Sequence, residues 1–544
     1  MAGSSYVIGI DFGTGSARAV LVDAADGRLA GHAQAAYPHG VMTGTLPGGE
    51  ALPPDWALQD ADDYLAVTRE LLTSLGERAR ADRAEVLAVG LDFTASTPLP
   101  ARADGAPLSR LHPGAPHAYV KLWKHHAAEP WAQRLNARGG DFLRYTGGMT
   151  SCEWLPAKAG QLASEAPALW AETERFIEAG DWMVWQLTGR EVRSSCQAGY
   201  KAHHVTGEGY PEALEAEAPG LRARLAEPRP IGTAAGALGG DWLRETGLPG
   251  EPVVAVATVD AHAVVPAVGV ARPGALVASL GTSACHLMVD PHCHCIPGVA
   301  GVVRDGILPG YWGYECGQAG FGDLLAWFVA AFAPDEPREQ AFARFREAAA
   351  ALAPGESGVL ALDWWHGCRT PLMNPGLSGL FVGMTLETSP AALYRALLES
   401  LCLGTRRVID TLTGGGLAVN ALLLTSGLAE RNPLLVRLMA DITGRSVQVP
   451  EVTEATARGA AIHALAASGA VAGFDEAVAR LGARSARSHE PDPAAVAVYD
   501  ELYALYGELA GQFGDGRLMA RLRALQPQRQ PAGGGPPAPS PEGC

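Results

Sequence analysis

Ile10-Asp11-Phe12-Gly13-Thr14-Gly15-Ser16 connects two strand-like patterns, at residues 6–11 and 19–23. A glycine-rich turn between two such runs predicts a β-hairpin. Leu280-Gly281-Thr282-Ser283 separates the strand-like patterns at 275–280 and 285–289 in the same way. Because both halves of the chain open on the same strand–Gly-Thr–strand unit, the sequence predicts an internal repeat with a cleft between its two copies.

The rest of the chain alternates helical and strand-like patterns. A strand is expected at 85–93, and helices are expected at 62–80, 167–177, 181–187, 390–412, 432–443 and 457–468. This alternation predicts an α/β fold, and a length of 544 residues suits two domains. We expect an N-terminal domain at 4–268, a C-terminal domain at 269–514 and, from its Pro- and Gly-rich composition, a disordered tail at 526–544.

The composition excludes several classes of protein. A hydrophobic content of 48% with 18% charged residues is typical of a packed globular chain. A net charge of −16 argues against nucleic-acid or anionic-membrane partners. The N-terminus lacks the basic region of a signal peptide, and the nine cysteines are odd in number and scattered. These features predict a cytoplasmic protein with reduced thiols.

The two glycine-rich turns have the composition of phosphate-binding loops. In such a turn, backbone N–H groups can approach phosphate oxygens, and the hydroxyls of Thr14 and Ser16 add further donors. Asp11, at the end of the preceding strand, could hold Mg²⁺ through water. An ordinary glycine hairpin remains the alternative for either turn alone. The stretch Thr425-Ser426-Gly427-Leu428 adds a strand end before a helix start, which suits a nucleotide edge.

These three elements, in this order, resemble the FGGY carbohydrate kinases. The resemblance covers the chain up to about residue 514 and points to the ribulokinase branch through long runs: LPPDWALQD, GLDFTASTPLP, HAYVKLWKHHA, FIEAGDWMVWQLTG, SSCQAGYKAHH, VATVDAHAVVPA, GYECGQAGFGDLLAWF and ALDWWHGCRTPL. It implies two actin/Hsp70-like (ribonuclease H-like) domains that flank a deep ATP/sugar cleft. It also implies ATP and Mg²⁺ as cofactors, a sugar substrate and a homodimer.

The resemblance assigns roles to individual residues. Asp260 matches the catalytic base, although an Asp before a helical pattern can also be an N-cap. The resemblance implies that the sugar is contacted by Lys201, Glu315 and Asp260. It adds a backbone contact at Ala95. Without the family, Lys201 and Glu315 would most often be solvated surface charges. The implied ATP-binding residues are Asp11, Gly13, Thr14, Ser16, Gly281, Thr282, Gly322, Gly427 and Asn432.

The implied reaction is transfer of a phosphoryl group from ATP to L-ribulose, giving L-ribulose 5-phosphate in L-arabinose catabolism. Sequence alone leaves open a D-ribulose, ribitol or xylulose kinase, because pocket contacts that separate such isomers are worth only a few kcal/mol. A chaperone-like or filament-forming ATPase of the same fold is the non-kinase alternative. It predicts a peptide-binding domain or self-assembly surfaces, and the chain ends instead in a short tail.

Several weaker assignments accompany these. Gln59 and Asp60 are expected near the cleft, Asp323 and Trp327 near adenosine, and Trp123 and Trp154 at the sugar site. The adenosine loop of the family usually reads Gly-Gly, whereas Ser426 stands at the first position here. The turn at 291–295, Pro-His-Cys-His-Cys, is dense in metal-binding side chains. Four consecutive ligands do not easily close one tetrahedron, so the sequence favours an ordinary hairpin end there.

Overall fold

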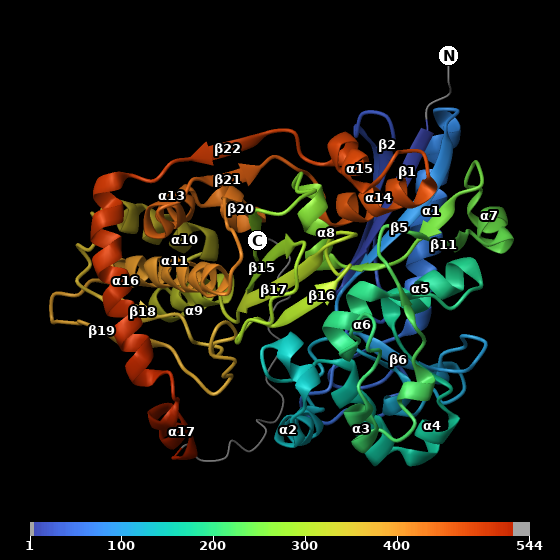
Figure 1. Cartoon of the computed structure of the whole chain (residues 1–544), viewed down its shortest axis with the longest axis horizontal. Helices are drawn as coiled ribbons and strands as arrows, with labels where there is room; N and C mark the ends of the chain where they lie inside the picture. The colour runs from blue at the N-terminus through green and yellow to red at the C-terminus, as the bar shows by residue number, and fades with distance from the viewer. Residues whose placement is uncertain (1–4, 526–544) are drawn as a thin grey trace.

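The computed structural model describes residues 5–525 and contains two large mixed sheets (Figure 1). The predicted disordered tail lies outside these residues. The first sheet has the strand order β11-β12-β5-β1-β2-β3, with β13 also paired to β5. Its strands are β1 (Ser5–Phe12), β2 (Ser16–Asp23), β3 (Leu29–Ala36), β5 (Glu85–Phe93), β11 (Ala234–Ala237), β12 (Val253–Ala255) and β13 (Thr258–Val259).

The second sheet repeats the plan of the first. Its order is β16-β17-β15-β14-β20-β21-β22, and its strands are β14 (Ala275–Leu280), β15 (Ala284–Asp290), β16 (Gly301–Arg304), β17 (Trp312–Gln318), β20 (Ala421–Thr425), β21 (Val447–Pro450) and β22 (Ala486–His489). In each sheet an antiparallel hairpin, β1–β2 or β14–β15, is followed by a parallel neighbour, β5 or β20. The predicted internal repeat is thereby confirmed.

Helices cover the sheets and fill an insertion after β5. They are α1 (Ala61–Ala81), α2 (Glu129–Arg138), α3 (Leu155–Glu165), α4 (Pro167–Glu172), α5 (Ala179–Thr188), α6 (Ser195–Ala202), α7 (Gly240–Thr246), α8 (Asp260–Ala267), α9 (Gly322–Phe332), α10 (Arg338–Ala350), α11 (Pro390–Gly414), α12 (Gly427–Arg431), α13 (Pro433–Thr443), α14 (Ala455–Ser468), α15 (Phe474–Leu481), α16 (Pro493–Phe513) and α17 (Arg517–Ala524). Among the described residues, no helix combines the length and apolar character needed to cross a bilayer.

Four small two-stranded sheets complete the fold. They pair β4 (Leu58–Gln59) with β7 (Val120–Lys121), β6 (Pro98–Ala101) with β8 (Arg175–Glu178), β9 (Arg193–Ser194) with β10 (Pro228–Arg229), and β18 (Leu360–Leu362) with β19 (Leu380–Val382). The helix predicted at 167–177 was therefore wrong in its second half. Phe176 and Ile177 are fully buried in β8, where pairing with β6 outweighs the helical pattern.

Helices α14 and α15 follow the second sheet's strand β21 in sequence but pack on the first sheet. Figure 1 shows them, in orange and red, beside the blue strands β1 and β2, and a cluster of buried side chains joins Val7 and Val20 to Ala461 and Leu465. The sheet and α14 approach so closely that a Cβ on Gly9 or on Gly90 would overlap the backbone of α14. The domain limits 4–268 and 269–514 stay a prediction. The packing crosses them, because α14 and α15 belong to the second range and contact the sheet of the first.

Candidate active site

Three acidic side chains lie where neighbouring strands of the first sheet end. Asp11, near the end of β1, is in register with Asp92 of β5, and Asp92 is in turn in register with Thr258 of β13. Asp260 follows β13 directly and begins α8. Because these strands run parallel, their carboxyl ends meet at one edge of the sheet, which is where open α/β sheets bind ligands.

Asp260 has the electrostatic character of a base for neutral pH. Burial and, after it, the neighbouring charge of Asp11 raise the pKa of its carboxyl to about 7, against the lowering effect of the hydrogen bond from the Ala261 N–H. The Asp260 carboxylate accepts that hydrogen bond at 2.7 Å. The N-cap alternative is not what the structure shows, because Val259 is the N-cap of α8 and Asp260 is its first residue.

Asp92 is an acidic residue of this site that the sequence reading missed. Its side chain is 0% exposed, and among residues 5–525 neither carboxylate oxygen has a hydrogen-bond partner. Burial, together with the charges of Asp11 and Asp260, holds its pKa well above the ordinary value. A signal was present, since an Asp within the otherwise apolar strand β5 is costly to bury without a use.

The cluster has the donor set of a divalent-cation site. Asp11 accepts a hydrogen bond from the Thr456 hydroxyl at 2.7 Å, which orients its carboxylate. Asp92, buried and unpartnered, lies beside it in the sheet register. Oxygen ligands of this kind suit Mg²⁺. The residues present therefore fit the Mg²⁺ that the sequence predicted at Asp11.

Lys201, Glu315 and His262 form a buried polar group beside Asp260. The Lys201 ammonium on α6 donates to both Glu315 carboxylate oxygens of β17, at 3.2 and 3.4 Å. His262, two residues after Asp260 on α8, lies with its Nε2 2.8 Å from the Glu315 carboxylate. Lys201 and Glu315 are not solvated surface charges, because their side chains are only 7% and 19% exposed.

The charges in this group stabilise one another. Burial alone would raise the pKa of Glu315, but the charges of Lys201 and His262 hold it well below its usual range. Burial alone would lower the pKa of His262, whereas contact with Cys196 and Glu315 raises it to about 9. His262 Nδ1 lies 3.1 Å from the Cys196 sulfur. Two cations thus flank an ionised Glu315 at neutral pH, an arrangement able to bind several hydroxyls of a polyol.

Three side chains, two aromatic and one amide, donate hydrogen bonds to the first glycine-rich loop. Tyr37 donates to the Gly13 carbonyl at 2.9 Å, and Gln59 donates to the Thr14 carbonyl at 2.8 Å. Trp123 donates its indole N–H to the Thr14 hydroxyl at 3.1 Å. These three bonds use loop carbonyls and one hydroxyl as acceptors, so they take up none of the turn's N–H groups, although the Gly13 N–H donates within the turn to the Ser16 carbonyl at 3.0 Å. Gln59 was expected near this site, and Tyr37 was not.

The second loop meets the start of α9. The N–H of Gly322 donates to the Gly281 carbonyl at 2.9 Å, and a Cβ on Gly322 would come within 2.7 Å of that oxygen. Asp323 donates its N–H to the Thr282 carbonyl at 3.3 Å. A glycine is therefore required where α9 begins, and the structure brings together the predicted residues Gly281, Thr282 and Gly322.

The loop that the sequence predicts to contact adenosine lies at the end of β20, beside β14. Ser426 takes a φ of 117°, a conformation that favours glycine, and its hydroxyl donates to the Leu280 carbonyl. That bond stabilises a serine in a backbone conformation that favours glycine. Gly427 begins α12, and the Asn432 side chain accepts from the Leu435 N–H at 3.1 Å as the N-cap of α13. The amide of Asn432 therefore also has a structural role.

The remaining predicted residues lie around these groups. Ala95 is in the turn after β5, where its carbonyl accepts from the Thr97 hydroxyl at 3.1 Å. The Trp154 ring lies 5.7 Å from the Lys201 ammonium, a cation–π contact. Ser16, the first residue of β2, accepts from the Gly13 N–H through its carbonyl at 3.0 Å. Asp60 accepts from the Asp62 N–H at 3.0 Å, so it caps α1.

Comparison with known proteins places this geometry in a family. Residues 276–468 match the C-terminal domain of the FGGY family of carbohydrate kinases. The chain is 42% identical to the ribulokinase of Geobacillus thermodenitrificans over 550 aligned residues, covering 96% of this chain and 97% of the relative. It is 44% identical to the ribulokinase of Mycolicibacterium smegmatis over 543 aligned residues, covering 96% of each chain.

Solved structures share the fold. A xylulose kinase from Rhodospirillum rubrum superposes with a TM-score of 0.82 at 24% identity, over 95% of this chain and all of that one. Glycerol kinase from Plasmodium falciparum, solved with ADP, gives a TM-score of 0.77 at 16% identity, over 93% of this chain and 98% of that one. The predicted actin/Hsp70-like α/β fold is confirmed, and on sequence identity this chain belongs to the ribulokinases of the FGGY carbohydrate kinase family.

Proposed function

We propose that the chain transfers the γ-phosphoryl group of ATP to the terminal hydroxyl of L-ribulose, giving L-ribulose 5-phosphate in L-arabinose catabolism. The observation that carries the proposal is Asp260, a carboxylate with a pKa near 7 at the edge of the first sheet, next to the buried Lys201–Glu315–His262 group. A homodimer in the cytoplasm belongs to the same proposal, on the family resemblance and on the ATP that the cytoplasm supplies.

Asp260 acts as the general base. As the sugar oxygen attacks the γ-phosphorus, its proton passes to the Asp260 carboxylate, the new O–P bond forms, and the bond to the β-phosphate oxygen breaks to release ADP. A base with a pKa of about 7 is largely ionised at slightly alkaline pH, yet still basic enough to take the proton in the transition state.

The two glycine-rich loops hold the nucleotide. Gly13 and Thr14 on one side and Gly281 and Thr282 on the other present turns of the same hairpin design, and Gly427 provides the edge for adenosine. When bound, Mg²⁺ would neutralise phosphate charge beside Asp11 and Asp92. Positioning and charge neutralisation supply most of the catalysis of phosphoryl transfer.

The sugar is held by the ionised pair Lys201–Glu315 and by the backbone at Ala95. Glu315 accepts from sugar hydroxyls and Lys201 donates to them, so one polyol can contact both charges. The small side chain of Ala95 leaves room for a five-carbon sugar. A substrate that lacks a matching hydroxyl leaves one of these buried groups unpaired, which is the physical basis for discrimination.

The test is ADP release coupled to NADH oxidation with L-ribulose, D-ribulose, L- and D-xylulose, ribitol and glycerol as acceptors. We expect the highest kcat/KM with L-ribulose. Glycerol as the best acceptor would refute the proposal. Best turnover with D-ribulose, ribitol or xylulose would retain the kinase and correct the sugar. ATP hydrolysis unaffected by any of the sugars would indicate the non-kinase ATPase.

A pair of variants links the result to the site. Lys201→Met should raise the KM for the sugar and leave the KM for ATP within about twofold, because Lys201 is proposed to contact the sugar and not the nucleotide. Arg69→Met is the matched control. Arg69 pairs with Glu245 at 2.8 Å, with both side chains about half-exposed, and its guanidinium lies over the Trp242 ring. Neither partner is a predicted site residue, so the loss of Arg69 should change neither constant.

A further inference from the structure

The turn after β15 is held in one conformation by a buried tyrosine. Tyr314 of β17 is 0% exposed, and its hydroxyl accepts from the His294 N–H at 2.8 Å while donating to the His292 carbonyl at 2.7 Å. Asp290, the last residue of β15, accepts from the His292 N–H at 2.9 Å. The backbone that carries both imidazoles is thus fixed at three points.

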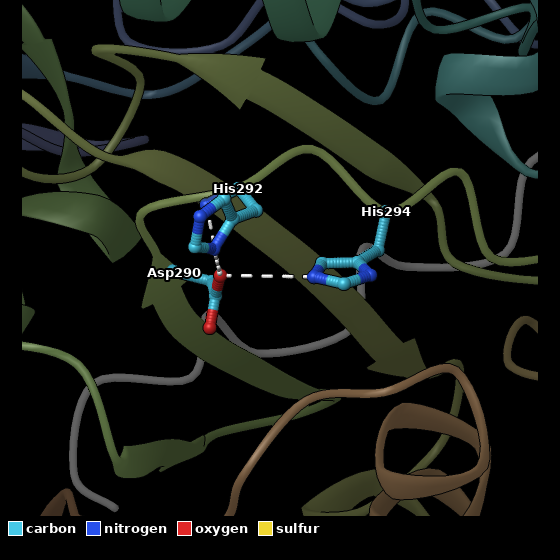
Figure 2. Close-up of side chains that lie close together, drawn as sticks. All are labelled: Asp290, His292 and His294. Atoms are coloured by element: carbon cyan, nitrogen blue, oxygen red, sulfur yellow. Dashed lines mark hydrogen bonds and ion pairs between the residues drawn. The ribbon is translucent and has the colours of Figure 1, made fainter.

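The fixed turn brings both imidazoles to one carboxylate oxygen. Figure 2 shows the rings of His292 and His294 directed at the Asp290 carboxylate. His292 Nδ1 and His294 Nε2 lie 3.5 and 3.7 Å from Asp290 Oδ1. The three ligand atoms all lie within 4.8 Å of one another.

These separations suit metal ligands better than hydrogen bonds. An N–H···O bond spans about 2.7–3.2 Å, so both Asp290 contacts are too long. In a tetrahedral zinc site, metal–ligand bonds of about 2.0–2.1 Å place neighbouring ligand atoms about 3.4 Å apart. Both measured nitrogen–oxygen distances, 3.5 and 3.7 Å, approach that value. The His292 side chain is 80% exposed, so its ring is free to rotate and bring the two nitrogens closer.

We propose that Asp290, His292 and His294 form a binding site for one zinc-like divalent transition-metal ion, outside the candidate active site. Two imidazoles and one carboxylate are a common three-ligand set for Zn²⁺, with a fourth position left to water or another ligand. Imidazole nitrogens favour Zn²⁺, Co²⁺ or Ni²⁺ over Mg²⁺. The sequence pointed to this turn through its His-Cys run, and the structure adds Asp290, which precedes that run, as the third side chain of the group.

The flanking thiols make the fourth position adaptable. Cys293 and Cys295 are both free and exposed, and they alternate along the turn with the two histidines. The ligand atoms that lie within 4.8 Å of one another belong to Asp290, His292 and His294 and include neither cysteine sulfur. The imidazoles and the carboxylate are therefore the primary ligands, and the cysteines are not required.

The test is a titration of the untagged full-length chain, stripped with EDTA, with Co²⁺ followed by visible absorption and then with Zn²⁺ by calorimetry. We expect one equivalent of Co²⁺ with a d–d band, displaced by Zn²⁺. His294→Ala and Asp290→Asn should each weaken binding at least tenfold, and His292→Ala/His294→Ala should abolish it. Since these residues lie outside the candidate active site, kinase turnover with MgATP should remain, and retained turnover shows that the variants are folded.

Two controls decide the outcome. His32→Ala removes another partly exposed histidine, paired with Glu454 at 3.6 Å, and should leave binding unchanged. Cys293→Ser/Cys295→Ser should retain one equivalent. The proposal is overturned if the wild type takes up no Co²⁺ or Zn²⁺, if His294→Ala binds as tightly as the wild type, or if binding follows the cysteines alone.

Discussion

The pKa of Asp260 makes a quantitative prediction about the pH dependence of turnover. Burial and the Asp11 charge raise that pKa to about 7, and the base must be ionised to accept a proton. At pH 8 about 90% of the carboxyl groups are ionised and at pH 6 about 10%, so kcat/KM should fall about tenfold between these values. Asp260→Asn should lower kcat by about 10²–10⁴-fold and remove the fall of kcat/KM between pH 8 and pH 6.

The same pKa shift gives a second readout, on stability. Because the folded pKa of Asp260, about 7, lies above the ordinary Asp value of 3.8, folding favours the protonated carboxyl. The contribution of Asp260 to the free energy of unfolding is therefore fully present below pH 4 and is lost as the pH rises through 7. Asp260→Asn escapes this loss, so at pH 8 its free energy of unfolding should exceed that of the wild type by up to about 4 kcal/mol.

Both quantities can be measured on the same preparations. Initial rates of ADP release with the best sugar, from pH 5.5 to 8.5, give the kinetic limb, and urea unfolding at pH 5 and pH 8 gives the stability difference. ATP binding to Asp260→Asn, by calorimetry, should stay within a few-fold of the wild type. A flat kcat/KM profile across this range, or turnover by Asp260→Asn within tenfold of the wild type, would refute the base role.

Two further predictions concern groups that support the site. His262→Ala removes a charged partner of Glu315 worth about 1.5–3 kcal/mol, so the sugar KM should rise tenfold or more, with His262→Gln restoring part of it; an equal rise in the ATP KM would contradict a role in positioning Glu315. Gly90→Ala places a Cβ inside contact distance of the Ala460 carbonyl, and urea unfolding should show a loss of more than about 2 kcal/mol; an unchanged midpoint would show that α14 can shift.

Local patterns predicted much of the fold. The strands at 85–93 and 275–280 occur in the structure with the same bounds, because apolar β-branched runs bounded by turns are a local signal. The two hairpins and their repeat were also readable from the sequence. The helix expected at 167–177 ends early, since the pairing of β8 with β6 joins segments about 75 residues apart, and no local pattern contains that contact.

For the candidate site too, local motifs could be predicted from the sequence and contacts between distant segments could not. Asp11 and Asp260 were identified because they lie in recognisable motifs at strand ends. The contact between His262 and Glu315 spans 53 positions in the sequence, and the Thr456 hydroxyl reaches Asp11 across 445. Neither partner could be paired without the fold. Asp92 was missed because its neighbours Leu91 and Phe93 make the strand look like ordinary core.

Helix α14 has a consequence for how the chain is made. Glycines at positions 9, 90 and 459 let it lie directly against β1, β5 and α8, where it covers one face of a sheet whose strands all lie between residues 5 and 259. During synthesis, α14 cannot cover that face until position 468 has left the ribosome. The strands of the first sheet are therefore synthesised well before their cover, and the apolar face stays open to chaperones or to neighbouring chains over that interval.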